Sequence, residues 1–261
     1  MNIAVITGAS SGMGREFLKR VASEQPVDEI WAIAKEDDKL EELKSEVKVP
    51  LRLFACDLTD KKALEKIKNE LEKTKPNITW LVNASGFGKF GRYDEIPVET
   101  SVNMIELNVV ALVTLTEYCL PYMEKGARII EFGSVAAFQP IPYINVYGAT
   151  KAFVLNYSLA LGAELKNRGI SVTCICPFWT KTAFFKRAVD PKNQVVTKYA
   201  AMYEPQDVMN RAYKDALKRK SVSMFGAYSK FQKFVVDIMP RKWIMNIWIK
   251  QQKLDKKYKD K

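Results

Sequence analysis

Near its start the chain runs Ile3-Ala4-Val5-Ile6-Thr7-Gly8-Ala9-Ser10-Ser11-Gly12-Met13-Gly14, and this stretch decides the fold. Its first residues are apolar and rich in β-branched side chains, which is typical of a buried parallel strand. The glycines at 8, 12 and 14 allow a tight turn and a close approach of the backbone to a ligand. A helix that begins after such a turn presents free N–H groups and the positive end of its dipole. The stretch therefore predicts a strand, a turn and a helix that together bind a pyrophosphate.

Short apolar segments alternate with amphipathic ones along most of the remaining sequence. The apolar segments predict strands at 3–7, 29–34, 51–55, 80–83, 127–132 and 171–176. The amphipathic segments predict helices at 14–23, 38–46, 60–74, 98–123 and 147–168. This alternation predicts right-handed βαβ units and an α/β fold with a Rossmann-like, doubly wound parallel sheet. We expect a single domain over residues 1–228, followed by a hydrophobic and basic C-terminal extension over 229–261.

The composition of the 261 residues excludes several classes of protein. Hydrophobic residues make up 48% and charged residues 27%, which excludes a disordered or collagen-like chain. The chain contains no histidine, so histidine triads, histidine bases and histidine metal ligands are excluded as well. Four cysteines without Cys-x-x-Cys spacing predict reduced thiols, and no metal is expected. Cys174 and Cys176 are two residues apart in an apolar run, which predicts that both side chains lie on one face of a strand.

The net charge of +11 is concentrated at the C-terminal end of the chain. Residues 214–261 contain 14 basic and 4 acidic residues, whereas the other residues contain 27 and 26. The first residues do not resemble a signal peptide, and no apolar run is expected to span a membrane, so we expect a cytoplasmic protein.

The C-terminal extension combines Trp243 and Trp248 with many lysines. This pattern leaves two interpretations open: peripheral contact with an anionic membrane surface, or a helix that covers the substrate pocket or a subunit partner. Binding of nucleic acid is not expected, because no interleaved aromatic and basic residues continue onto the rest of the chain.

Ser134, Tyr147 and Lys151 form the pattern that points to chemistry. Tyr147 and Lys151 are one helical turn apart, so their side chains share a face of the predicted helix. A free tyrosine titrates near ~10, and an adjacent ammonium group is expected to lower that pKa. Tyr147 would then exchange a proton with an oxygen that Ser134 holds. This pattern predicts interconversion of a carbonyl and an alcohol.

In their order and spacing these motifs resemble the short-chain dehydrogenase/reductase family, whose members are Rossmann-fold enzymes that use NAD or NADP. The resemblance is strong over about residues 3–182 and weak over 204–226. It implies catalytic roles for Asn108, Ser134, Tyr147 and Lys151, with Asn108 in a proton relay and Lys151 also bonded to the nicotinamide ribose. It implies cofactor contacts from Gly8, Ser10, Ser11, Gly12, Met13, Gly14, Lys35, Asp57, Leu58, Asn83, Tyr147, Lys151, Pro177, Thr180 and Thr182. The chain departs from the family at Ala84, where an asparagine is usual, and at Phe178, where a glycine is usual.

The choice between NAD and NADP depends on the residues that follow the predicted second strand. An acidic residue at position 34 would accept the ribose hydroxyls of NAD and repel a 2′-phosphate. The chain has Ala34 there, followed by Lys35, and Ser10 or Ser11 could add hydroxyl donors. The pattern therefore predicts a preference for NADP(H). NAD(H) stays an alternative, because Lys35 is a point charge and Glu36 is adjacent to it.

Aromatic residues on the loops near the same crevice predict a small lipophilic carbonyl substrate of the hydroxysteroid or 3-oxoacyl type. The expected substrate contacts are Ser134, Phe138, Tyr143, Tyr147 and Phe184. The predicted function is hydride transfer between NADP(H) and a ketone or secondary alcohol. The alternative is a non-catalytic sensor or membrane-associated scaffold that only binds the dinucleotide. The resemblance also implies a homodimer or homotetramer that pairs the helices at 98–123 and 147–168.

Overall fold

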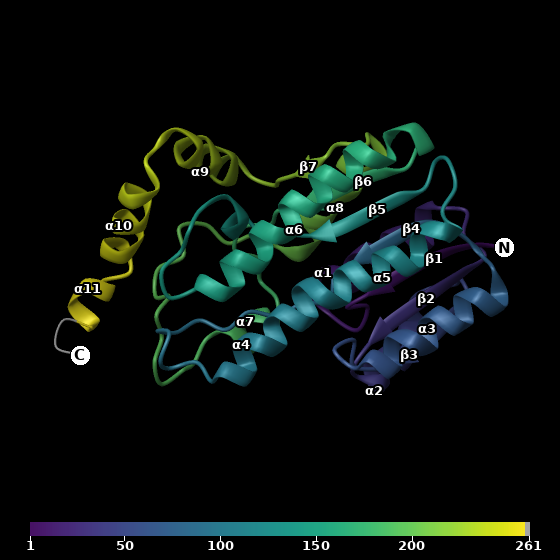
Figure 1. Ribbon diagram of the computed structural model, residues 1–261, viewed down its shortest axis with the longest axis horizontal. Helices are drawn as coiled ribbons and strands as arrows, with labels where there is room; N and C mark the ends of the chain where they lie inside the picture. Colours follow the sequence, from purple (N-terminus) through teal and green to yellow (C-terminus); the bar gives the residue numbers. More distant parts are fainter. Residues whose placement is uncertain (259–261) are drawn as a thin grey trace.

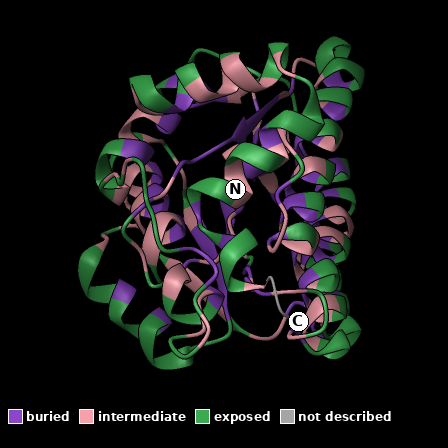
Figure 2. Ribbon diagram, turned by 90° about the vertical axis from the view of Figure 1, so that its left-hand side faces the viewer, coloured by how far each residue is buried: buried purple, intermediate pink, exposed green. Residues whose placement is uncertain are grey.

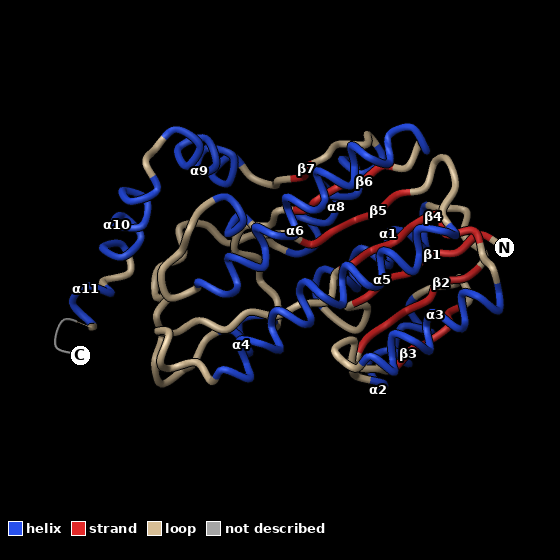
Figure 3. The backbone as a smooth tube through the Cα atoms, in the orientation of Figure 1, coloured by secondary structure: helices blue, strands red, loops and turns tan. Residues whose placement is uncertain are grey.

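Apolar segments form a seven-stranded parallel sheet at the centre of the computed structural model, which describes residues 1–258 (Figure 1, Figure 3). The strands are β1 (Asn2–Thr7), β2 (Glu29–Ala34), β3 (Leu51–Ala55), β4 (Asn77–Asn83), β5 (Arg128–Phe132), β6 (Ser171–Ile175) and β7 (Val222–Ser223). Their order in the sheet is β3-β2-β1-β4-β5-β6-β7. The order changes direction between β1 and β4, and such a switch point opens a crevice at the carboxyl ends of the strands.

Helices cover both faces of the sheet. The strands carry apolar side chains on both faces, and each face is therefore buried against helices. The helices of the sheet domain are α1 (Gly12–Glu24), α2 (Asp37–Glu46), α3 (Lys61–Thr74), α4 (Val98–Ile105), α5 (Leu112–Cys119), α6 (Asn145–Glu164), α7 (Phe184–Ala188) and α8 (Pro205–Leu217). Ile3 and Val5 of β1 belong to a core cluster with α3, α5 and α6. Ala4 and Ile6 belong to a second cluster with α1, α2 and α8. In Figure 2 the buried residues lie on the strands and on the inward sides of the helices.

The doubly wound sheet predicted from the sequence is confirmed. The bounds of β2 and β3 are those expected, and the other predicted strands differ by one to three residues at their ends. The helix predicted from residue 60 begins at Lys61, because Asp60 is its N-cap and accepts a hydrogen bond from the Lys62 N–H at 2.9 Å.

The helix predicted at 98–123 is interrupted. A π-helical segment, η1 (Glu106–Ala111), separates α4 from α5, and a 3₁₀ turn, η2 (Leu120–Tyr122), ends the run. Such π segments occur frequently at functional sites. By length and composition alone, Val98–Tyr122 is long and apolar enough to cross a membrane, a property that core helices share. Its inward residues, among them Leu115 and Cys119, are part of the core beneath the sheet.

The segment after β6 contains elements that the sequence did not indicate. Helix α8 packs against α1, and β7 pairs with β6 at the edge of the sheet. The extension then forms α9 (Ala227–Ile238), α10 (Arg241–Gln251) and α11 (Leu254–Lys257). These three helices lie beyond the carboxyl ends of the strands, at the end of the molecule opposite the N-terminus (Figure 1). The last residues of the predicted extension, 259–261, lie outside the described residues.

Candidate active site

The turn between β1 and α1 forms a cradle without side chains. Gly8 has a φ of +64°, and a Cβ there would lie 2.9 Å from the backbone carbonyl carbon of Ala84. A Cβ at Gly14 would overlap the carbonyl oxygen of Gly8. Ser11 is the N-cap of α1 and its side chain makes no capping hydrogen bond, which leaves N–H groups of the first turn for a ligand. The cradle therefore fits a pyrophosphate, as the sequence predicted.

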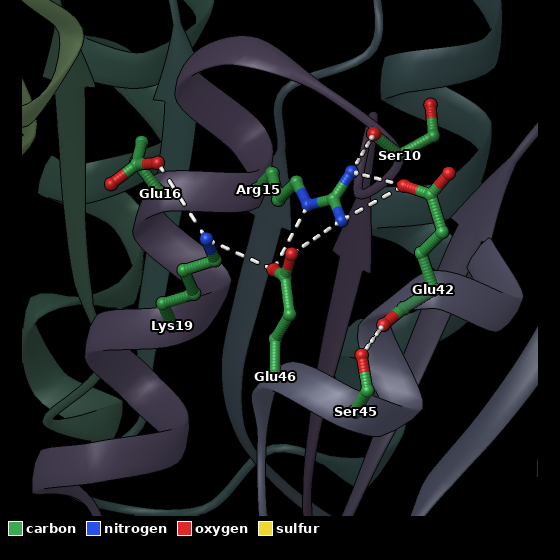
Figure 4. Close-up of polar contacts among 7 residues, drawn as sticks. All are labelled: Ser10, Arg15, Glu16, Lys19, Glu42, Ser45 and Glu46. Carbon is green, nitrogen blue, oxygen red and sulfur yellow. Dashed lines mark hydrogen bonds and ion pairs between the residues drawn. The ribbon is translucent and has the colours of Figure 1, made fainter. Parts of the chain in front are cut away.

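Arg15, in the first turn of α1, holds the preceding turn in place (Figure 4). Its Nη1 donates to the carbonyl oxygen of Ser10 at 3.1 Å, and its guanidinium pairs with Glu42 and Glu46 of α2 at 3.1 and 2.7 Å. The hydrogen bond from Arg15, followed by that from Lys19, lowers the pKa of Glu46 to about 2. The turn is thus tied to α2 through a fixed cluster of charges.

A groove runs from this turn across the carboxyl ends of the strands. Ten of the residues predicted to bind a cofactor line it: Gly8, Ser10, Ser11, Gly12, Met13, Gly14, Lys35, Asp57, Leu58 and Thr182. The others, except Asn83, line an adjoining cavity: Tyr147, Lys151, Pro177 and Thr180. The groove and the cavity share Met13, Thr182 and Phe184, so they form one continuous site.

The outer end of the groove carries both signs of charge. Lys35 Nζ lies 2.7 Å from Asp57 Oδ2, and the Ser10 hydroxyl donates to Glu36 at 3.0 Å. Burial acts to raise the pKa of Asp57, but the bonds from Lys35 and Thr59 outweigh it and lower that pKa to about 2. Arg187 of α7 also lines the groove, with its guanidinium 3.5 Å from the centroid of the Phe87 ring. Arg187 was not predicted from the sequence, because α7 is only five residues long and lies far from the groove's other residues along the chain.

Ser134, Tyr147 and Lys151 meet in the cavity wall. Ser134 follows β5 as the N-cap of a short 3₁₀ turn, η3 (Val135–Phe138), and its Oγ accepts from the Ala136 N–H at 3.1 Å. Tyr147 and Lys151 share one face of α6, with Lys151 Nζ 5.8 Å from the centroid of the Tyr147 ring. The ammonium donates to the carbonyl oxygen of Phe132 at 2.6 Å. The structure therefore brings the three predicted catalytic side chains together.

The lowering of the Tyr147 pKa that we expect from Lys151 together with a positively charged nicotinamide belongs to the cofactor-bound state, and in the protein alone burial has the larger effect. Burial raises the pKa of Tyr147 to about 12, although the hydrogen bond with Ser134 opposes the shift. Burial also lowers the pKa of Lys151 to about 8, against the influence of Cys174, Cys176 and Glu131. Tyr147 is therefore a neutral phenol at physiological pH, which is the form that donates a proton.

Asn108 is brought below the site by the π-helical segment. Its side chain bonds both backbone groups of Phe87, accepting from the N–H at 3.0 Å and donating to the carbonyl oxygen at 2.9 Å. It also donates to the Thr150 hydroxyl at 3.1 Å. A Cβ at Gly86 would lie 2.8 Å from Asn108 Oδ1 and 3.5 Å from Lys151 Nζ. Asn108 therefore fixes the loop after β4 against α6, beside the lysine.

The side chain of Asn83, a predicted cofactor contact, faces the core and not the groove. Asn83 is buried at the end of β4, where its Nδ2 donates to Thr116 at 2.9 Å and to Glu131 Oε1 at 3.1 Å. Its side chain points to the core because Glu131, buried on the neighbouring strand, needs donors. Burial raises the pKa of Glu131 to about 8.

All four cysteines are free. Cys174 and Cys176 lie on one face of the chain with their sulfurs 3.8 Å apart, as predicted from their spacing. Both pack near Gly133, where a Cβ would lie 2.7 Å from Cys174 Sγ and 3.3 Å from Cys176 Sγ. Gly133 thus leaves room for two sulfurs behind the catalytic serine.

The cavity beside the catalytic residues is mainly aromatic and aliphatic. Phe90, Tyr147 and Phe184 pack with ring centroids 5.5–6.0 Å apart. A Cβ at Gly88 would lie 2.7 Å from Phe184 and 3.0 Å from the Tyr147 ring, so this glycine leaves space for both. The far wall comes from the extension, whose contributing residues are Tyr228, Gln232, Trp248, Gln251 and Gln252.

Two of the predicted substrate contacts, Phe138 and Tyr143, do not line this cavity. Phe138 does not line this cavity but a neighbouring one, and its ring lies 5.1 Å from Lys233 Nζ. Tyr143 has a φ of +67° and stacks on Tyr258 of the extension, with the centroids 5.0 Å apart. The extension draws both rings out of the site, which a prediction from local sequence could not include. Ser134, Tyr147 and Phe184 line the cavity as expected.

Known proteins share this arrangement. The model of the short chain dehydrogenase family matches residues 2–193. The chain is 32% identical to the sulfoacetaldehyde reductase 2 of Chromohalobacter salexigens over 192 residues, which are 70% of this chain and 74% of the relative. It is also 32% identical to the very-long-chain 3-oxoacyl-CoA reductase of Bos taurus over 197 residues, 70% of this chain and 62% of that one. Among solved structures, a short-chain dehydrogenase from Sphingobium yanoikuyae in complex with NADPH superposes with a TM-score of 0.76 at 25% identity, covering 94% of this chain and 96% of that one.

Proposed function

Because this chain belongs to the short chain dehydrogenase family, we propose that it is an NADP(H)-dependent oxidoreductase that interconverts a lipophilic ketone and a secondary alcohol. The observation that carries the proposal is the convergence of Ser134, Tyr147 and Lys151 where the glycine-lined groove meets the apolar cavity. A protein that only binds a dinucleotide has no need for a proton donor at this point.

Each side chain has a role in reduction. The cofactor supplies the hydride when it is bound. Ser134 would donate its hydroxyl hydrogen to the carbonyl oxygen of the substrate and hold that oxygen beside Tyr147. Tyr147, a neutral phenol, would donate its proton to the same oxygen. The Lys151 ammonium, one turn away, stabilises the phenolate that this transfer leaves.

The cavity supports a lipophilic substrate. Aromatic and aliphatic side chains surround the catalytic hydroxyls, and Gln232 and Gln251 supply polar groups from the extension. A ketone inside a long acyl chain or a steroid would bury its apolar body against these rings. The similarity to a very-long-chain 3-oxoacyl-CoA reductase favours the same class of substrate.

The proposal is tested by following consumption of NADPH with a panel of steroid ketones, 3-oxoacyl thioesters and aromatic ketones. We expect turnover with at least one class that is apolar on both sides of the carbonyl. If every class fails while NADPH still binds, the catalytic proposal is contradicted and the dinucleotide-binding sensor or scaffold is favoured.

The preference for NADP(H) rests on the cations at the outer end of the groove. Lys35, Lys39 and Arg187 line it, against the carboxylates of Glu36 and Asp57. We therefore expect NADPH to bind more tightly than NADH, by a margin that the two carboxylates limit.

Exchanging Lys35 for aspartate is expected to reverse this order. Lys35→Asp would weaken NADPH by roughly tenfold or more, since a charge-assisted hydrogen bond to phosphate becomes a repulsion. Lys44→Asp is the matched control, because Lys44 is an exposed lysine of α2 that pairs with Glu41 away from the groove. Fluorescence titration with both dinucleotides measures the four affinities, and equal affinities in the unmodified protein would refute the preference.

We further propose that the protein forms a homodimer. The support is an exposed apolar face outside the site, formed by Val102, Ile105 and Val110 with Phe153 and Leu159 of α6.

A further inference from the structure

Helices α9 to α11 of the extension are held firmly on the body of the protein. Trp248 Nε1 donates to the carbonyl oxygen of Pro142 at 3.0 Å, and Gln252 Oε1 accepts from the backbone of Thr197 and Lys198 at 2.9 and 3.0 Å. Ile244 and Leu254 are buried beneath the helices. The extension is therefore an ordered part of the molecule with an inner and an outer side.

The outer side of α9 and α10 carries large apolar side chains that are exposed to solvent. Phe231, Phe234, Ile238, Trp243 and Ile247 are each between 52% and 66% exposed. In α9 they are three and four residues apart, and in α10 four apart, so each helix presents them along one stripe. We call these five residues the outer tail face. Contiguous exposed apolar residues of this size mark interaction sites.

Basic residues accompany the outer tail face. The described part of the extension contains the following eight: Lys230, Lys233, Arg241, Lys242, Lys250, Lys253, Lys256 and Lys257. Its acidic residues are Asp237 and Asp255, and Asp237 pairs with Lys233 at 2.5 Å. The residues before the extension hold 31 basic and 27 acidic side chains, so the excess of positive charge is local.

We propose that the outer tail face binds an anionic phospholipid surface. An exposed apolar stripe on each of two consecutive helices, with lysines and arginine beside it, matches the apolar and anionic layers of such a surface. A second copy of this chain fits less well, because two such faces would bring the same positive charges together. The other exposed apolar face, on α4 and α6, lacks this accumulation of lysines.

The inner side of the same helices belongs to the site. Tyr228 and Gln232 of α9, with Trp248 and Gln251 of α10, line the cavity beside the catalytic residues. Binding to a membrane would thus place the cavity wall one helix thickness from the lipid.

The test is co-sedimentation of the full chain with vesicles of phosphatidylcholine alone or mixed with phosphatidylglycerol. We expect at least tenfold stronger binding to the anionic vesicles, weakened by high salt. Phe231→Ser/Phe234→Ser/Trp243→Ser should lower this binding at least tenfold, and Lys230→Glu/Lys242→Glu should lower it as well. The matched control is Tyr93→Ser, which removes an exposed aromatic side chain outside the outer tail face and outside the face on α4 and α6, and should leave binding unchanged.

Circular dichroism and thermal unfolding establish that each variant is folded. Equal binding to both kinds of vesicle, or none to either, overturns the proposal. So does anionic binding that survives the triple serine substitution in folded protein. If the unmodified protein binds no vesicles and the triple serine variant forms a smaller oligomer than it does, the outer tail face is instead a contact between copies of the chain.

Discussion

At the scale of single residues, the site depends on a balance between burial and hydrogen bonding at Tyr147 and Lys151. Burial keeps the phenol protonated, with its pKa raised to about 12, and it brings the pKa of the ammonium down to about 8. A protonated Tyr147 donates to a carbonyl oxygen, whereas alcohol oxidation requires the phenolate. In the protein alone Tyr147 is therefore in the form that donates a proton.

The lysine should set the pH dependence of reduction. Lys151 is charged below its pKa of about 8 and neutral above it, so it stabilises the developing phenolate only at lower pH. We expect kcat/KM for reduction to be constant below about pH 7 and to fall about tenfold per pH unit above pH 8, since kcat/KM reports the groups of the free enzyme.

Lys151→Met provides the check on this assignment. The variant should lose roughly 100-fold or more in kcat/KM, and its residual rate should not show the decrease near pH 8. If kcat/KM of Lys151→Met still decreased near pH 8, a group other than Lys151 would cause the pH dependence.

The proximity of the three predicted catalytic residues was predictable from the sequence because their relation is local. Tyr147 and Lys151 are one helical turn apart, and Ser134 directly follows a strand. The sequence does not indicate the contacts of Phe138 with Lys233 and of Tyr143 with Tyr258, because the partners are about a hundred residues away. The same holds for Asn83, whose side chain donates to the buried carboxyl group of Glu131 on the next strand.

At the scale of elements, the phosphate-binding turn depends on the contact between α1 and α2. Arg15→Met removes the hydrogen bond to the Ser10 carbonyl and both pairs to α2. We expect the KM for the cofactor to rise by roughly tenfold, as for loss of a partly buried charged hydrogen bond, with little change in kcat.

Lys19→Met is the control for that prediction, because Lys19 also pairs with Glu46 but makes no contact with the turn. Steady-state kinetics at saturating carbonyl substrate measure both variants. A similar rise in the cofactor KM in Arg15→Met and Lys19→Met would show that cofactor binding depends on the positive charge of α1 and not on the hydrogen bond to the turn.

Strands and long helices were predictable from periodicity, but their irregularities were not. The π-helical segment at Glu106–Ala111 has the same apolar pattern as an α-helix, so periodicity does not reveal its different backbone hydrogen bonding. It contains Asn108, whose side chain bonds Phe87 and Thr150. Strand β7 has two residues and exists because β6 offers it an edge. Such features follow from tertiary contacts.

At the scale of the whole molecule, the protein presents two separate apolar surfaces. The outer tail face is accompanied by lysines, whereas the face on α4 and α6 is not. We expect the latter to form the homodimer, because burying five large apolar side chains is favourable. Val102→Glu/Phe153→Glu should convert the dimer to a monomer, as measured by light scattering.

Tyr93→Glu is the control for the dimer, since Tyr93 is 80% exposed on a loop outside that face. Dimers that persist in the double variant would show that copies associate elsewhere, and a monomeric unmodified protein would contradict the expected assembly.

The most direct test of the whole account compares turnover and cofactor binding in Tyr147→Phe. This change removes one oxygen and keeps the ring that packs with Phe90 and Phe184. With the best ketone of the panel, we expect kcat to fall by about 100-fold or more, while the affinity for NADPH stays within about twofold because the groove is intact. Turnover that remains at the level of the unmodified protein would contradict the role of Tyr147 as the proton donor.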